Sequence, residues 1–272
     1  MRCARRLNGR WLNVCEWAGS LLTETKNTGT TPEGSQSEQE AARWVRGMFR
    51  RVAPRYDLAN HLLSANIDRS WRAHTVERVR DILRRPGARV MDLACGTGDL
   101  LVALEREASP SALVFGSDFC HPMLAVAKSK LARLRLKPAL LEADALSLPL
   151  PDASLDLITI AFGFRNLANY RTGLAEMRRV LRPGGALAIL EFTQPPNKAF
   201  AAIYNWYSRR VLPILGGVIS GAPEAYRYLP ESVRKFPEAA ELAAMMGEAG
   251  YAPVEWEYLT FGIVALHVGR VG

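Results

Sequence analysis

The stretch VMDLACGTGDL, Val90 to Leu100, joins an apolar run to a turn with two glycines and then to the start of an amphipathic segment. An apolar run that ends in a glycine-rich turn is typical of a buried strand followed by a helix. Gly96 and Gly98 lie in the turn, and the carboxylates Asp92 and Asp99 stand on either side of it. In sheets built from such units, ligands bind at this first turn. The stretch therefore predicts a strand, a turn and a helix that place two acids beside a ligand site.

The same alternation of short apolar runs and helical segments continues along the chain. Repeated strand–helix–strand units predict an α/β fold with a mostly parallel, doubly wound sheet. At the end of the chain, a helix at 236–250 precedes two strands that meet around residues 260–262, and we expect them to add an antiparallel hairpin to the sheet. A Pro-Gly-Gly sequence is expected to end the helix before the fifth strand. We predict strands at 88–94, 112–119, 138–144, 155–163 and 185–192, with helices at 99–107, 122–134 and 171–185.

Composition limits the class of protein without choosing a function. The chain has 272 residues, 49% of them hydrophobic and 23% charged, which is ordinary for a soluble globular protein. Its formal net charge of +8 favours anionic neighbours such as nucleic acid, a membrane surface or an acidic protein. The four cysteines have no C-x-x-C pair and no histidine cluster near them, which argues against a zinc site or a disulfide framework and favours a reducing cytoplasm.

The distribution of polar residues predicts a tail followed by one domain. Residues 1–17 are rich in arginine, which fits either an organelle targeting segment or an over-long start. Residues 23–40 have few apolar side chains. We therefore expect residues 1–40 to form a basic and then polar flexible tail, and residues 41–272 to form the folded domain. Within the domain we predict a helical lid at 41–85 and a sheet core at 86–272, with an apolar insertion at 199–235 for the substrate or a membrane.

Two kinds of ligand could bind the turn at Gly96 and Gly98. A dinucleotide would place its pyrophosphate on the helix start, but the dinucleotide fingerprint needs a third glycine where Leu101 stands. Asp92 and Asp99 would also repel a pyrophosphate in a partly desolvated site. The two acids favour a cationic ligand instead, and S-adenosylmethionine carries an ammonium and a sulfonium beside its adenosine.

We therefore predict an S-adenosylmethionine site at the carboxyl ends of the strands. Asp92 would lie near the methionine ammonium, and Asp118, at the end of the second strand, would bind both ribose hydroxyls. Asp144, after the third strand, would reach the adenine amino group. The alternative is that Asp92 and Asp99 only cap the following helix. The predicted cofactor-binding residues are Asp92, Gly96, Thr97, Gly98, Asp118, Asp144 and Ala145, and no metal ligand is predicted.

Several longer motifs carry a resemblance to known methyltransferases. The D-x-x-C-G-T-G turn, the acid after the second strand and the L-R-P-G-G sequence resemble class I S-adenosylmethionine-dependent methyltransferases. This resemblance implies a seven-stranded sheet of strand order 3-2-1-4-5-7-6, helices on both faces and an N-terminal helical lid. From about Arg46 to Gly269 the chain is similar to the family that methylates the ring carbon of menaquinone and ubiquinone precursors. The motifs are Tyr56 to Trp71, Ala161 to Leu167, Arg179 to Pro195, Tyr226 to Pro237 and the ending LTFGIVALHVG.

The family resemblance also implies catalytic residues. Arg165 and Asn166 match the family's F-G-x-R-N motif, which it associates with the quinol. We expect Arg165 to stabilise a phenolate or to orient a water that acts as base, and Asn166 to hold a ring oxygen; the alternative is that the pair only organises the loop. Tyr56 and Asp57 are expected in a helical lid over the cofactor, with Tyr56 among the catalytic residues. His61 and His74 are expected to be surface or capping residues, with a role as proton carriers as the alternative; His121 is expected to be a bystander near the ribose, and Glu191 a structural residue.

The expected reaction is C-methylation of the ring of a reduced polyprenylated quinone precursor. Asp68 stands where many ubiquinone-type members have a histidine, and this favours demethylmenaquinol as the substrate. Asn66 replaces a common glycine and Thr193 a common serine. A benzoquinol of the ubiquinone pathway or another small aromatic acceptor remains the alternative within enzymes. From other classes we considered an RNA-binding protein and a noncatalytic subunit of a quinone-synthesis assembly.

A long isoprenoid tail on the substrate implies access from a membrane. No segment reaches the roughly 18 apolar residues of a membrane span, so we expect a cytoplasmic protein that associates peripherally with the inner face of the membrane. Two segments could contact it: the basic amphipathic helix at Trp44 to Arg51, and the apolar region from Phe200 to Ile219. For the first, a core-facing helix with a solvated arginine face is an equal alternative. No nucleic-acid partner is expected, and a homodimer is left open.

Overall fold

A seven-stranded sheet organises the computed structural model, which describes residues 4–7, 10–13, 29–210, 213–214, 216–217 and 222–272. The strand order is β5-β4-β3-β6-β7-β9-β8, which is 3-2-1-4-5-7-6 when the strands of this sheet are numbered along the chain. Neighbouring strands from β5 to β7 are parallel, whereas β9 is antiparallel to both β7 and β8. The predicted topology, including the antiparallel hairpin, is confirmed. The strands are β3 (Arg89–Leu93), β4 (Leu113–Asp118), β5 (Ala139–Glu142), β6 (Leu155–Ala161), β7 (Leu181–Phe192), β8 (Tyr251–Leu259) and β9 (Val264–Val271).

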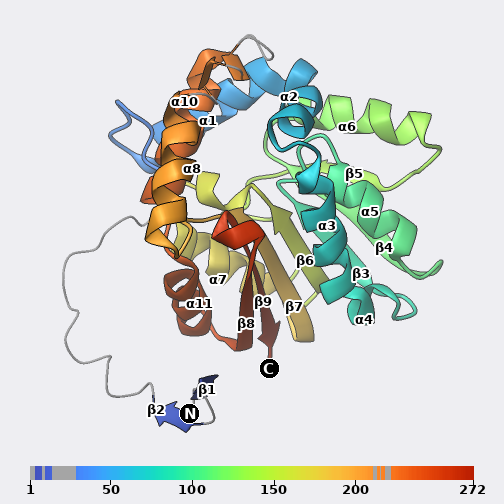
Figure 1. Ribbon diagram of the computed structural model, residues 1–272. Helices are drawn as coiled ribbons and strands as arrows, with labels where there is room; N and C mark the ends of the chain where they lie inside the picture. Colours follow the sequence, from blue (N-terminus) through green and yellow to red (C-terminus); the bar gives the residue numbers. More distant parts are fainter. Residues whose placement is uncertain (1–3, 8–9, 14–28, 211–212, 215, 218–221) are drawn as a thin grey trace.

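Helices cover both faces of the sheet, as the prediction required (Figure 1). Successive side chains of a strand point to opposite faces, so Leu157 and Ile158 of β6 belong to two different apolar cores. The core around Leu157 packs against α3 (Ile67–Arg78), α4 (Arg80–Leu83), α5 (Asp99–Glu107) and α6 (His121–Arg133). The core around Ile158 packs against α7 (Tyr170–Val180) and α11 (Ala239–Glu248).

The fifth strand of the sheet begins earlier than predicted. The Pro-Gly-Gly sequence was expected to lie at the end of a helix, but α7 ends at Val180 and β7 begins at Leu181. Leu181 is buried and already pairs with Leu155, after which the register shifts so that Leu157 pairs with Ala186. The Pro-Gly-Gly sequence therefore forms an irregularity inside β7, because the strand starts with a buried leucine before the turn residues.

A layer of helices lies at the end of the sheet where the parallel strands terminate (Figure 1). Helix α1 starts at the cap residue Ser37, whose side chain accepts a hydrogen bond of 3.2 Å from the backbone of Glu40. Its apolar side chains face the domain, so the core-facing alternative for this helix holds and its apolar face is not available to a membrane. The layer consists of α1 (Glu38–Val52), η2 (Ala53–Arg55), α2 (Tyr56–Leu63), α8 (Lys198–Arg210) and α10 (Pro223–Lys235).

Part of the predicted tail contacts the domain. The backbone N–H of Thr30 donates to the carbonyl of Leu167 over 2.8 Å, and Nζ of Lys235 donates to the carbonyl of Thr31 over 2.8 Å. These contacts begin before residue 41, the boundary that composition predicted. Further upstream, β1 (Ala4–Leu7) and β2 (Arg10–Asn13) form an antiparallel pair, and residues 14–28 lie outside the described part. Within the described residues, no helix combines the length and apolar character needed to cross a bilayer.

Candidate active site

The turn between β3 and α5 has the backbone geometry that its glycines predict. Gly98 caps the start of α5 with a φ of 87°, and Gly96 has a φ of 55°; both values lie in the left-handed region that favours glycine. A Cβ on Gly96 would meet no atom within 4 Å, because this residue borders open space. Its requirement for glycine is therefore conformational, and its backbone is accessible to a ligand.

Hydrogen bonds to Asp118 link this turn to the end of β4. One carboxylate oxygen accepts a hydrogen bond from the backbone of Gly96 and the other from the backbone of Cys120, each over 2.8 Å. Burial raises the pKa of Asp118 to about 6, although these hydrogen bonds act in the opposite direction. A ligand with hydroxyl groups or positive charge would stabilise the ionised form.

Asp92 is a buried acid with one unsatisfied oxygen. Its side chain lies at the end of β3 and is 1% exposed. Oδ1 accepts a hydrogen bond of 2.8 Å from Thr159, whereas Oδ2 has no partner among the described residues. Burial raises the pKa of Asp92 to about 7. An unpaired buried carboxylate oxygen is costly, and a cationic group that reached it would remove that cost.

A cavity opens beside the turn, and we call it the inner cavity. The ends of β3, β4, β5 and β6 supply one wall, and α1 and α2 cover the other. Of the predicted cofactor residues, Gly96, Asp118, Asp144 and Ala145 line this cavity. Asp92, Thr97 and Gly98 do not line it. Its lining comprises Ala42, Phe49, Tyr56, Leu93, Ala94, Gly96, Asp118, Phe119, Met123, Ala143, Asp144, Ala145, Leu146, Ala161, Phe162, Gly163, Asn166, Leu167 and Ala168.

A second cavity of about 340 Å³, the lid cavity, lies between α1–α3, α8 and α10. Most of its lining is aromatic or aliphatic, and Phe49, Tyr56 and Phe162 border both this cavity and the inner one. The two spaces therefore share a wall of three aromatic side chains. The lid cavity is lined by Met48, Phe49, Val52, Tyr56, Asn60, Leu63, Ser64, Ala65, Ile67, Asp68, Trp71, Arg72, Phe162, Arg165, Phe192, Tyr204, Tyr207, Ala225, Tyr226, Tyr228, Leu229, Thr260 and Ile263.

Arg165 borders the lid cavity and is held by buried partners. Its Nη1 donates to Oε1 of Glu191 over 2.8 Å and to the carbonyl of Phe162 over 2.7 Å, and Nε donates to Ser232 over 3.3 Å. Burial alone would lower the pKa of Arg165, but the charge of Glu191 raises it, so the net shift is upward. Glu191 is 1% exposed and also accepts from two backbone N–H groups, of Arg165 and Phe192. The pair thus presents a fixed cation at the cavity wall.

Asn166 faces the inner cavity, whereas Arg165 faces the lid cavity. The two residues follow each other in η3 (Phe164–Asn166), and in a 3₁₀-helix consecutive side chains point about 120° apart. Oδ1 of Asn166 accepts a hydrogen bond of 3.0 Å from the hydroxyl of Tyr228. Asn166 was expected to hold a ring oxygen beside Arg165, and the structure does not place it in the same cavity.

Tyr56 lies at the boundary between the two cavities. Its ring packs edge-on against Phe49, with ring centroids 6.1 Å apart. Burial raises the pKa of Tyr56, and the positive charge of Arg165 lowers it in part. The hydroxyl therefore stays protonated at neutral pH and can act as a hydrogen-bond donor.

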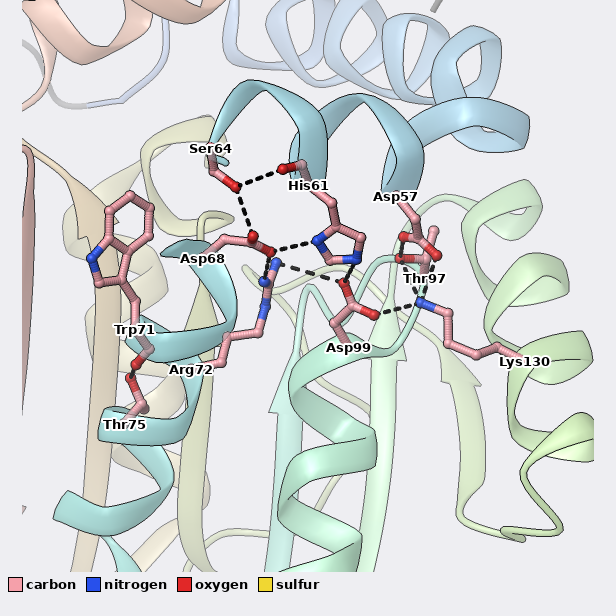
Figure 2. Close-up of polar contacts among 10 residues, drawn as sticks. All are labelled: Asp57, His61, Ser64, Asp68, Trp71, Arg72, Thr75, Thr97, Asp99 and Lys130. Atoms are coloured by element: carbon pink, nitrogen blue, oxygen red, sulfur yellow. Dashed lines mark hydrogen bonds and ion pairs between the residues drawn. The ribbon is translucent and has the colours of Figure 1, made fainter. Parts of the chain in front are cut away.

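A charged network ties the lid to the turn, and the sequence prediction missed it (Figure 2). His61 lies 2.9 Å from Asp68 and 3.5 Å from Asp99, and Lys130 lies 2.6 Å from Asp99. Ser64 donates to Asp68 over 2.6 Å. The signal was present as a polar stripe at helical spacing, Asp57, His61, Ser64, Asp68 and Arg72, on α2 and α3.

The acids of this network are paired with cationic side chains of the protein itself. Burial would raise the pKa of Asp68, but the hydrogen bond from Ser64 and the charge of Arg72 bring it below its usual value. Ligand atoms of His61, Asp68 and Asp99 lie within 4.8 Å of one another, a spacing that could hold a metal ion. Arg72 already pairs with Asp68, and Lys130 already pairs with Asp99, so each of these carboxylates has a cationic partner in the protein.

The other candidate side chains lie outside both cavities. His74 pairs with Glu257 and His121 with Glu142, each over 2.9 Å and with partly exposed side chains. Asp99 pairs with Lys130 and does not line the inner cavity. The acids that border the inner cavity are thus Asp118 and Asp144 among the described residues.

The sheet order and the acid-lined turn define a class I methyltransferase fold, and solved structures agree. The [4+2]-cyclase SpnF matches with a TM-score of 0.64 at 17% identity, covering 90% of this chain and 100% of that one. A SAM-dependent methyltransferase of Thermotoga maritima, a possible histamine N-methyltransferase by its description, matches with a TM-score of 0.58 at 18% identity, covering 83% and 99%. At these identities the likeness concerns the fold alone.

Sequence comparison then gives the family. The model of the ubiE/COQ5 methyltransferase family matches residues 35–271. A demethylmenaquinone methyltransferase of Thermus thermophilus is 53% identical over 222 residues, 82% of this chain and 99% of that protein. A protein of the same name from Deinococcus radiodurans is 46% identical, with 85% and 94% covered. The ubiquinone/menaquinone biosynthesis C-methyltransferase UbiE of Ralstonia pickettii is 44% identical, with 86% and 94% covered. The chain belongs to the ubiE/COQ5 methyltransferase family, as its motifs predicted, and is a methyltransferase.

Proposed function

We propose that this enzyme transfers a methyl group from S-adenosylmethionine to a ring carbon of a reduced polyprenylated quinone precursor, with demethylmenaquinol as its acceptor. The observation that carries the proposal is the pair of cavities that share the wall of Phe49, Tyr56 and Phe162. One cavity has acids at the ends of parallel strands, and the other has a mostly apolar lining that includes the buried Arg165. The names of the relatives from Thermus thermophilus and Deinococcus radiodurans support demethylmenaquinol over a benzoquinol.

The chemistry of the inner cavity fits the methyl donor. Asp118 lines it and can accept hydrogen bonds from ribose hydroxyls through lone pairs that its backbone partners leave free. Asp144 borders the same cavity and would receive the adenine amino group. Oδ2 of Asp92 has no hydrogen-bond partner among the described residues, and the methionine ammonium would pair with it. A pyrophosphate would instead meet these carboxylates as like charges.

The lid cavity supplies what methyl transfer to carbon requires. Transfer of a hydroxyl proton to water gives a phenolate, whose electron pair moves through the ring to the adjacent carbon. That carbon forms a bond to the methyl group while the carbon–sulfur bond breaks, and its electrons remain on sulfur, which becomes a neutral thioether. The ring carbon then loses its own proton to solvent and the ring becomes aromatic again. Arg165, held by Glu191, would stabilise the phenolate, and the aromatic wall would keep water from the methyl group.

We further propose that the mouth of the lid cavity docks on a membrane. In α8, Tyr204 and Tyr207 line the cavity, while Ile203 and Trp206 are 68% and 64% exposed. Phe261, next to the lining residue Thr260, is 80% exposed. Leu58 and Leu62 of α2 are also exposed, as are Arg69 of α3 and Arg209 and Arg210 of α8, and each of these three helices contributes residues to the cavity lining. Apolar side chains flanked by arginines are typical of a surface that binds anionic lipid.

The test is an assay of which lipid receives the methyl group. The full chain is incubated with S-adenosylmethionine labelled in its methyl group and, in separate reactions, with the reduced demethylated naphthoquinone and the reduced demethylated benzoquinone precursor. We expect label in the naphthoquinol product. Label in the benzoquinol alone would change the substrate, and label in neither acceptor would overturn the proposal.

A further inference from the structure

We propose that Arg72 binds the second ring oxygen of the quinol, on the side of the ring opposite the oxygen that Arg165 binds. The acceptor would thus be recognised as a ring with two para oxygens, each facing its own guanidinium. The inference rests on the proposed function, because it concerns the substrate of that same lid cavity. Asn166, which was expected to hold a ring oxygen, does not line this cavity, so another donor is needed.

Arg72 is one of three charged residues in the lining of the lid cavity within the described part of the chain; the others are Asp68 and Arg165. Each arginine is paired with its own carboxylate: Arg165 with Glu191, and Arg72 with Asp68. The two carboxylates are 1% and 4% exposed. Their oxygens are engaged by further hydrogen bonds, which leaves the arginines as the strong donors of the cavity.

The two guanidinium groups stand over adjacent aromatic rings. Cζ of Arg72 lies 5.5 Å from the ring centroid of Phe162, and Cζ of Arg165 lies 5.4 Å from that of Phe192. The centroids of Phe162 and Phe192 are only 4.7 Å apart. The lid cavity is therefore lined by two neighbouring rings with one cation on each. We infer that the flat acceptor packs against these rings, with one guanidinium beside each of the two oxygens of its hydroxylated ring.

Arg72 retains donors for a ligand. Its Nη1 pairs with Asp68, but Nη2 lies 3.9 Å from the nearest carboxylate oxygen of Asp99, which is too far for a hydrogen bond. A guanidinium has five N–H groups in a fixed fork, so the pair with Asp68 does not exhaust it. The charges of both Arg165 and Arg72 act on Tyr56 and lower its pKa in part, consistent with a ring that lies near both.

The chemistry assigns one oxygen to each arginine. The oxygen next to the methylated carbon must become the phenolate, and the proposed function gives the phenolate to Arg165, which lines the lid cavity, so this oxygen belongs to Arg165. The para oxygen lies beside the carbon that bears the isoprenoid chain. It would face Arg72 on α3, which puts the chain on the side of the lid helices.

The test compares two acceptors in wild type and in Arg72→Gln. One acceptor is the prenylated 1,4-dihydroxynaphthalene, and the other lacks only the hydroxyl beside the prenyl chain. A charge-assisted hydrogen bond corresponds to about a tenfold to hundredfold change in kcat/KM. For wild type, we expect kcat/KM to fall by this factor when the hydroxyl is removed from the acceptor. On the diol, we expect kcat/KM of Arg72→Gln to be lower than that of wild type by the same factor. On the monohydroxy acceptor, wild type and Arg72→Gln should then agree to within about twofold.

Lys130→Gln is the matched control, because Lys130 belongs to the same charge network but does not line the lid cavity. Its effect, whatever the size, should be equal on both acceptors. Arg72→Lys keeps the charge beside Asp68 and serves as a second variant if Arg72→Gln does not fold. An equal loss on both acceptors for either Arg72 variant would refute the inference while leaving the proposed function intact. Failure of wild type to methylate the diol would instead refute the proposed function and this inference with it.

Discussion

Nζ of Lys130 lies 2.6 Å from Oδ2 of Asp57, so an ion pair joins α6 of the sheet layer to α2 of the lid. The same ammonium lies 2.6 Å from Asp99 at the start of α5, and Thr97 of the turn donates to Asp57 (Figure 2). The helix that covers the inner cavity is thus anchored to the turn that forms its floor. The same side chains thus link α2, the turn, α5 and α6.

Replacing Lys130 with Gln should loosen α2 without unfolding the domain. Removing a partly buried ion pair is expected to raise amide hydrogen exchange in residues 56–63 by about fivefold. Exchange in β3 to β7 should be unchanged. Lys128→Gln, an exposed lysine of the same helix, serves as the control. If exchange in α2 is the same in both variants, the ion pair does not hold the lid.

The pKa of Asp92 gives the stability of the ligand-free protein a defined pH dependence. Burial raises this pKa to about 7, above its value in the unfolded chain, so the folded state binds more protons between about pH 4 and pH 7. The contribution of Asp92 to stability therefore falls as the pH rises through this range. The melting temperature of Asp92→Asn minus that of wild type should increase from pH 5 to pH 8. Asp144→Asn, at an exposed acid, is measured beside it as the surface control.

The same carboxylate should make donor binding depend on pH. A positive ligand favours the ionised form of Asp92, so we expect the affinity of wild type for S-adenosylmethionine to increase as the pH rises from 5.5 to 7.5. Calorimetry near pH 6.5 in buffers of different ionisation enthalpy should report proton release on binding. Proton uptake, or an affinity without pH dependence, would contradict the role of Asp92.

The pair of Arg165 and Glu191 allows catalysis and stability to be separated. Arg165→Met should lower both, since it leaves Glu191 charged and buried, and loss of one partner of such a pair costs about 3–5 kcal/mol. Adding Glu191→Leu should restore most of the thermal stability but none of the turnover. Donor affinity should change by less than about threefold in the double variant, because the inner cavity does not include either residue. Restored turnover would show that the arginine acts only in folding.

Membrane docking through the mouth of the lid cavity predicts a local effect. Trp206→Ser combined with Phe261→Ser should reduce sedimentation with vesicles of phosphatidylglycerol and phosphatidylethanolamine by about tenfold. Leu113→Ser is the matched control, because Leu113 is 54% exposed but lies at the opposite end of the sheet, at the start of β4. High salt should release part of the bound wild-type protein. Equal binding of both variants would exclude this docking surface.

The strand order could be anticipated from the sequence because its signals are local or carried by the family's motifs. The apolar run of β6 and the glycine turn before α5 can each be recognised from about ten consecutive residues. The predicted start of β7 was wrong, because a Pro-Gly-Gly turn inside a strand has the same sequence signal as a turn that ends a helix. Pairing with β6 determines where β7 begins, and strand pairing does not follow from the local sequence.

The site was predicted less completely than the fold. Residues at the strand ends, such as Asp118 and Asp144, follow from topology and do border one cavity. Asp99, which pairs with His61, comes from α5, and Lys130, which pairs with Asp57, comes from α6; no periodicity links these elements to the lid. The separation of Arg165 from Asn166 depends on a single turn of 3₁₀-helix, whose direction the sequence does not reveal.

The hydroxyl of Tyr228 has a single hydrogen. This fixes the donor and the acceptor in the two hydrogen bonds that link Thr30, in the N-terminal segment, through Tyr228 to Asn166 at the inner cavity. Since Tyr228 donates to Oδ1 of Asn166, Thr30 must donate to Tyr228 over their 2.7 Å contact. The amide of Asn166 is thereby oriented with its carbonyl toward the tyrosine and its NH₂ group toward Phe162 and the cavity. A ligand that contacts this NH₂ group therefore needs a hydrogen-bond acceptor, such as a carboxylate oxygen or a ring nitrogen with a lone pair. A ligand that offers an N–H at this point would find no acceptor on Asn166.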